Sequence, residues 1–163
     1  LPEAQLDRFF FKLDVDYPSV SELVEIADRT TGTEAPQPQP VANSEAIRGM
    51  QLLARGVPIA THVTEAAARL VRATLPYDEA APQVVRRYVS YGSSPRGMQA
   101  LILASKIGSL LDGRYNAAVD DLRAAALPAL RHRLILNFEA QAEGVTTDTL
   151  IQEIAETVLG SAQ

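Results

Sequence analysis

The sequence predicts a mainly α-helical protein with a single β-strand near its N-terminus. Apolar side chains recur at the three- and four-residue spacing of helices through almost the whole chain after Pro18. Only residues 9–17 show the alternation of apolar and polar side chains that is typical of a strand. The chain has 163 residues, of which 47% are hydrophobic, so it can bury a core without disulfides or structural metal ions.

The predicted strand carries apolar side chains at its odd positions and Lys12, Asp14 and Asp16 at even positions. A lone strand would leave its backbone donors and acceptors without partners. We therefore interpret residues 1–17 as the end of a larger sheet domain whose other strands are absent from this sequence. Residues 18–163 are then expected to form a separate helical domain.

The helices are predicted wherever a capping residue precedes apolar residues at helical spacing. The first begins at Ser19 or Ser21 and ends at about Arg29. The prolines that follow predict an extended, mobile loop over residues 31–42. Further helices are predicted from Asn43 or Ser44 to Arg55, from Thr64 to Leu75, from Pro82 to Val89, from Ser94 to Leu111, from Val119 to Leu127 and from Thr146 or Thr147 to Leu159, with residues 134–138 extended. The helix from Ser94 is the longest, and its predicted buried residues include Leu101 and Leu111.

The composition argues against several classes of function. The sequence has no cysteine, so it forms no disulfide, thiolate metal site or cysteine nucleophile. Its 20 acidic residues outnumber its 15 Lys and Arg residues, and the net charge of −5 argues against non-specific nucleic-acid binding. No apolar run reaches the ~18 residues of a membrane span and no signal peptide is evident, which indicates a cytoplasmic protein. His62 and His132 lack partners at metal-ligand spacing, so no metal site is expected.

The segment 91–97 carries the clearest chemical signal. Ser94 suits the N-cap of the longest helix, and Pro95 suits its first position, where a missing N–H is no loss. Arg96 then lies in the first turn, where the helix dipole disfavours a cation. Exposed N–H groups, the dipole and the guanidinium group would converge on an anion such as phosphate. The alternative is an Arg96 side chain that extends into solvent or pairs with a nearby carboxylate.

Arg8 is the second candidate for binding an anion. It lies just before the predicted strand, where a long cationic side chain can project from the domain surface toward a neighbouring molecule. An ion pair with Asp7 or Glu3 is the alternative, and sequence spacing alone favours it. The basic segment 131–133 is interpreted as an exposed helix end, with an interface patch as the alternative.

Two segments of the sequence resemble functional motifs of the MoxR-type AAA+ ATPases. Residues 1–9, LPEAQLDRF, are similar to the stretch after sensor 1 of that family, in which the arginine finger matches Arg8. Residues 91–97, YGSSPRG, resemble the family's sensor 2 motif, in which the sensor arginine matches Arg96.

Two shorter matches follow in the same order as in the family, namely DGR at 112–114 and LRHR at 130–133. The resemblance spans nearly the whole chain, apart from the prolines around residues 34–40. It implies a helical-bundle AAA+ lid domain, preceded by a remnant strand from a truncated α/β core.

The resemblance also implies a function. In this family a parallel-sheet core binds ATP and Mg²⁺, a helical lid closes on the nucleotide, and subunits assemble into rings, commonly hexamers. Such proteins are chaperone-like remodelling ATPases that act with von Willebrand factor A-type partners. Arg8 and Arg96 would act on the terminal phosphate, with Ser94 and Pro95 beside the nucleotide. Whether Arg96 acts within one subunit or across an interface stays open.

The sequence also departs from the family's pattern. It contains no G-x-x-x-x-G-K-[ST] loop and no hydrophobic run that ends in Asp-Glu and could hold Mg²⁺. On its own, the chain is therefore expected to bind no nucleotide and to hydrolyse no ATP. A stand-alone helical interaction module without a nucleotide role is the alternative function.

Overall fold

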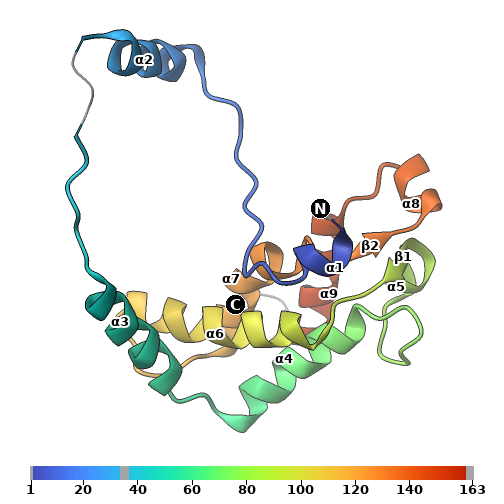
Figure 1. Ribbon diagram of the computed structural model, residues 1–163. Coiled ribbons are helices and arrows are strands. Elements are labelled where there is room, and N and C mark those ends of the chain that lie inside the picture. The colour runs from blue at the N-terminus through green and yellow to red at the C-terminus, as the bar shows by residue number, and fades with distance from the viewer. Residues whose placement is uncertain (1, 34–36, 161–163) are drawn as a thin grey trace. The chain divides into compact units, whose positions relative to one another are not determined.

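The computed structural model describes residues 2–33 and 37–160, with the side chains of residues 3 and 4 left out (Figure 1). The chain separates into two compact units. The larger unit contains the residues up to Lys12 and those from Leu52 onward, and the smaller unit is Leu13–Gln51. The functional division into a core remnant, 1–17, and a lid, 18–163, stays a prediction. So does the mobility of the proline-rich loop, in which residues 34–36 lie outside the described part.

Four helices form the core of the larger unit. They are α4 (Thr61–Ala73), α6 (Pro95–Leu111), α7 (Val119–Leu130) and α9 (Thr147–Leu159). Helix α6 packs against α4 and α7, and α9 packs against α4 and α7 (Figure 1). The large side chains that are fully buried between them include Leu70, Leu101, Leu122, Leu130, Ile151 and Ile154. The mainly helical fold class is therefore confirmed, and its stability comes from burying the apolar stripe of each helix.

The larger unit also contains a two-stranded antiparallel sheet. Its strands are β1 (Val89–Tyr91) and β2 (Ile135–Leu136), with the short helices α5 (Gln83–Tyr88) before β1 and α8 (Phe138–Ala142) after β2. The extended segment predicted over residues 134–138 is confirmed at Ile135–Leu136, but Phe138 begins α8, and neither β1 nor α8 was predicted. Pairing of β1 with β2 brings the start of α6 close to the loop that follows α7, and this loop carries Arg133.

Ion pairs stabilise the turn between α6 and α7. Gly113 has a φ of 71°, a left-handed conformation that glycine adopts without strain. The Arg114 guanidinium binds the carboxylates of both Asp112 and Asp121. Burial opposes ionisation of Asp121, but its hydrogen bonds with Arg114 and with the Ala118 N–H hold its pKa below the ordinary value. The DGR segment therefore has a structural role in this turn.

The predicted N-terminal strand is not formed. No residue from Phe9 to Tyr17 pairs in a β-ladder with any other described residue, although the alternation of side chains is present. A strand needs a neighbouring strand for its backbone hydrogen bonds, and the described part of the chain offers none at this position. Instead, a short helix α1 (Glu3–Leu6) leads into a turn, and the Lys12 N–H donates to the Pro128 carbonyl at 2.9 Å.

The smaller unit contains helix α2 (Val20–Thr31) and the start of α3 (Ser44–Gly56), which continues into the larger unit. Of the two predicted N-caps, Ser19 and Ser21, the structure has Ser19, which forms a capping box with Glu22 at the start of α2. None of the α2 residues is buried. Its apolar side chains therefore add little to the stability of the described chain.

Three helix details differ from the sequence predictions. Helix α4 begins at Thr61, three residues before the predicted Thr64, and its N-cap makes no side-chain hydrogen bond that the sequence could reveal. Helix α7 continues through Pro128 to Leu130, although proline inside a helix removes one backbone hydrogen bond and crowds the carbonyl four residues earlier, so the packing of α7 against α6 and α9 must offset this cost. Leu111 is 83% exposed, since it lies at the last residue of α6, beyond the packed face.

Candidate functional site

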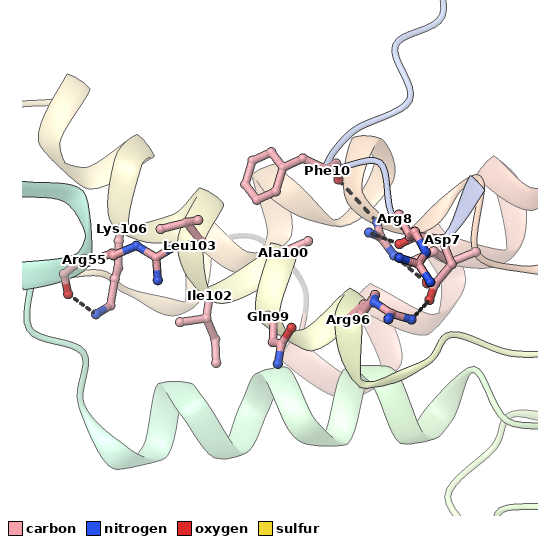
Figure 2. A pocket seen from close by; sticks show the side chains of 11 residues that line it. Asp7, Arg8, Phe10, Arg55, Arg96, Gln99, Ala100, Ile102, Leu103 and Lys106 are labelled. Atoms are coloured by element: carbon pink, nitrogen blue, oxygen red, sulfur yellow. Dashed lines mark hydrogen bonds and ion pairs between the residues drawn. The ribbon is translucent and has the colours of Figure 1, made fainter. Parts of the chain in front are cut away.

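Arg8 and Arg96 line one pocket of about 630 Å³ in the larger unit. Figure 2 shows Arg8, Asp7 and Arg96 gathered at one end of this pocket, with Arg55 and Lys106 at the other. The two candidates for binding an anion, which are 88 positions apart in the sequence, are thus brought to one site. Basic side chains outnumber carboxylates in its lining, so the pocket is suited to an anionic ligand.

The start of α6 holds Arg96 as the sequence predicts. Ser94 is the N-cap and its Oγ accepts a hydrogen bond from the Arg96 N–H at 3.1 Å, while Pro95 occupies the first helical position. Two glycines of the same segment are required sterically. A Cβ at Gly92 would overlap the backbone of Thr74, and a Cβ at Gly97 would overlap the Oγ of a neighbouring serine. The GSSPRG pattern therefore encodes a tightly packed helix start.

Asp7 connects the N-terminal segment to this helix start. Its carboxylate accepts hydrogen bonds from the Ser94 hydroxyl at 2.9 and 3.0 Å, from Arg96 Nη1 at 3.2 Å and from Arg133 Nε at 3.1 Å. Burial opposes ionisation of the carboxyl group, but the bonds from Ser94 and Arg96 and the charge of Arg133 together hold the pKa of Asp7 below its ordinary value. Asp7 is therefore an ionised acceptor shared by three donors.

The two candidate arginines differ in how they are held. Arg96 pairs with Asp7, yet its side chain is 53% exposed, so most of its donors remain available to a ligand. Arg8 is exposed and does not form the ion pair with Asp7 that was the alternative to anion binding; the Asp7 carboxylate instead pairs with Arg96 and Arg133. The other suggested partner of Arg8, Glu3, has its side chain outside the described part of the chain.

Sequence reasoning missed Asp7 and Arg133 as members of the site. Interpretation of segment 131–133 as an exposed helix end was wrong for Arg133, whose side chain is 3% exposed. It was also wrong for Arg131, which is 14% exposed and pairs with Asp148 at 2.7 Å. The LRHR resemblance was the available signal, since local spacing does not reveal a partner 126 positions away.

The pocket fits a phosphate group but not a magnesium ion. Guanidinium groups match phosphate oxygens in geometry and charge. Among residues 2–33 and 37–160, no cluster of three or more His, Cys, Asp or Glu side chains could hold a metal ion. Any Mg²⁺ that accompanied a nucleotide would need ligands from residues other than these.

Within the described ranges, each helix is too short or too polar to cross a membrane.

The chain is similar to a known domain family and to several known proteins. Residues 82–154 match the family model of the AAA lid domain. Chaperone MoxR1 of Mycobacterium tuberculosis is 32% identical over 158 residues, which are 97% of this chain and 42% of MoxR1. Protein MoxR of Paracoccus denitrificans is 31% identical over 151 residues, which are 84% of this chain and 44% of that protein.

A solved structure has the same fold. The crystal structure of a proposed ATPase from Cytophaga hutchinsonii matches with a TM-score of 0.87 and 29% identity, over 97% of this chain and 48% of the other. The chain thus spans less than half the length of each of these three relatives.

Proposed function

Because this chain belongs to the MoxR family of AAA+ ATPases, with its AAA lid domain at residues 82–154, we propose that it supplies the lid of an ATP-driven, chaperone-like remodelling ATPase. In this proposal Arg8 and Arg96 bind the terminal phosphate of ATP. The observation that carries it is the shared pocket, in which both guanidinium groups lie at the same end (Figure 2).

Arg8 is proposed as the arginine finger. Its exposed side chain can reach a nucleotide held by another subunit, as the family resemblance implies. Charge that develops on the transferred phosphoryl group is stabilised by a positioned cation, and an arginine finger is worth ~10³–10⁵ in rate in other NTPases. Arg8 would therefore act mainly on turnover and little on nucleotide affinity.

Arg96 is proposed as the residue that senses the terminal phosphate. Asp7 holds one of its nitrogens at 3.2 Å, so an arriving phosphate competes with a carboxylate that is already shared with Ser94 and Arg133. Hydrolysis would return Arg96 to Asp7. This exchange of one anion for another would link the nucleotide state to the position of α6, and hence to lid closure.

The shared pocket also favours one answer to where Arg96 acts. If Arg8 reaches the nucleotide of a neighbouring subunit, then Arg96, at the same end of the same pocket, reaches that same phosphate. We therefore propose that both act across a subunit interface in a ring. The hexameric ring size, the contact of Ser94 and Pro95 with the nucleotide, the von Willebrand factor A-type partner and the cytoplasmic location rest on the family resemblance alone and stay predictions.

The test uses the full-length protein that contains the nucleotide-binding core. Arg8→Ala should reduce the kcat of ATP hydrolysis by at least ~100-fold while the Kd for ATP changes less than about threefold. Arg96→Ala should also lower kcat. Arg69→Ala is the matched control, because Arg69 is exposed on α4 and its only ion pair in the described chain is with Glu65 at 3.9 Å. Unchanged turnover in Arg8→Ala would refute the finger assignment.

A further inference from the structure

Arg133 is a buried cation whose contacts gather on one short segment. Its side chain is 3% exposed, and burial lowers its pKa despite the opposing effect of Asp7. Nε donates to Asp7 Oδ1 at 3.1 Å and Nη2 donates to the Asp7 carbonyl at 3.0 Å. The Phe9 carbonyl accepts from Nη2 at 2.7 Å and the Phe10 carbonyl from Nη1 at 3.3 Å. The remaining bond goes to the Ala129 carbonyl in the last turn of α7.

These bonds hold the backbone on both sides of Arg8. The carbonyl before it, at Asp7, and the carbonyl after it, at Phe9, both accept from Arg133. His132 adds a second donor, because its Nε2 lies 2.9 Å from the Phe9 carbonyl oxygen. The Arg8 side chain is exposed, but it extends from a backbone that is hydrogen-bonded to the two residues Arg133 and His132 of the loop after α7.

The same guanidinium group acts on Arg96 through Asp7. The Asp7 carboxylate lies between Arg133 Nε and Arg96 Nη1, and it also accepts from the N-cap hydroxyl of α6. A Cβ at Gly97 would approach Arg133 Cδ to 3.2 Å, so the absence of a side chain there lets Arg133 pass beneath the first turn of α6. The buried Arg133 side chain thus contacts both the backbone that carries Arg8 and the carboxylate that binds Arg96.

We propose that Arg133 is the positioning residue that fixes Arg8 and Arg96 relative to each other. This inference rests on the proposed function and deepens it. A charged group lowers a barrier only when it is held in the productive geometry before the reaction, and a small misplacement loses much of the effect. A buried arginine with five hydrogen bonds to fixed acceptors provides that rigidity, whereas two solvated arginines on separate segments would not.

The experiment compares Arg133→Met with Arg131→Met in the full-length protein. Methionine keeps an unbranched apolar stem in place of the arginine side chain but removes all donors. Arg131 is the matched control, since it is also a mostly buried arginine in an ion pair in the same loop, yet none of its described hydrogen bonds reaches residues 7–10. We expect Arg133→Met to lower kcat for ATP at least ~10-fold with a change in KM under about threefold, and Arg131→Met to change kcat less than about twofold.

A second measurement does not depend on ATP. Amide hydrogen exchange in the peptide that covers residues 5–12 should accelerate in Arg133→Met and not in Arg131→Met. Unchanged exchange in this peptide would overturn the positioning role, whatever the turnover. This readout separates the inference from the proposed function, which fails instead when Arg8→Ala leaves turnover intact.

A double-mutant cycle separates positioning from general stability. If Arg133 acts through Arg8, Arg133→Met should lower turnover much less in an Arg8→Ala background than in the wild type. An equal fold-loss in both backgrounds would mean that Arg133 acts independently of Arg8, and would refute the proposal. Asp7→Asn serves as the second variant if Arg133→Met fails to fold. It keeps an acceptor for Ser94 but removes the charge between the two arginines, and it should show the same non-additivity with Arg8→Ala.

Discussion

Replacement of glycine by alanine should destabilise the chain at Gly97 and stabilise it at Gly108, although both residues lie in α6. A Cβ at Gly97 would overlap Ser93 Oγ and would approach Leu130 Cδ2 to 3.0 Å and Arg133 Cδ to 3.2 Å. A Cβ at Gly108 would meet only Asp121 Oδ1, at the ordinary contact distance of 3.8 Å. The two variants have the same chemical change in the same helix, so the difference between their stabilities reports the packing around each glycine.

The magnitudes follow from two opposing contributions. Alanine in place of glycine inside a helix stabilises by about 0.5–1 kcal/mol, because the unfolded chain loses less conformational entropy on folding. At Gly108 we expect this gain undiminished. At Gly97 the crowding of three neighbours costs about 2 kcal/mol, which exceeds the gain and leaves a net destabilisation of about 1 kcal/mol. The two variants should therefore differ by about 2 kcal/mol in the free energy of unfolding.

Urea unfolding of the 163-residue chain, followed by circular dichroism, measures this difference directly. The denaturation midpoints should move in opposite directions from the wild type at an unchanged m-value. Thermal midpoints should move by ~2–4 °C per kcal/mol for a chain of this size. If Gly97→Ala proves as stable as Gly108→Ala, the steric account of the GSSPRG segment is wrong.

Two other predictions concern the Asp7 carboxylate, which joins the N-terminal segment to the start of α6. Because the pKa of Asp7 is lower in the folded chain than its ordinary value of 3.8, the unfolded chain binds the proton more tightly. The ionised Asp7 carboxylate therefore contributes fully to the free energy of unfolding above about pH 4, and this contribution is lost as the pH falls through the folded pKa. A pH series of urea midpoints should then show a shallower loss of stability toward acid pH in Asp7→Asn than in the wild type. Ser94→Ala removes both the N-cap acceptor and a donor to Asp7, so it should destabilise the chain by about 1–2 kcal/mol in the same urea assay, and an unchanged midpoint would contradict the capping role.

Local chemistry made several elements predictable. Ser19 with Glu22, Ser94 with Pro95, and Thr146 each satisfy donors at a helix start within a few residues, so the helices that follow them begin where the sequence predicts. The interactions that failed to be predicted are long-range ones. Whether the alternating residues from Phe9 form a strand depends on a partner strand, and alternation itself says nothing about whether that partner is present.

In the candidate site, too, local features were predictable from the sequence and long-range contacts were not. A cation in the first turn of a helix and the motif around it are visible in the sequence and selected Arg96, whereas the position of Arg8 and the resemblance of residues 1–9 selected Arg8. Their common pocket was not visible, nor was the carboxylate of Asp7 between Arg96 and Arg133.

The mainly helical content and the starts of α2, α6 and α9 were thus determined by the sequence alone, since each depends on contacts within about one helical turn. The tertiary structure decided which carboxylate holds Arg96, why Arg133 is buried and how the N-terminal segment reaches the start of α6. Those contacts join residues about ninety positions apart or more, and they form only when the core between α4, α6, α7 and α9 brings the segments together.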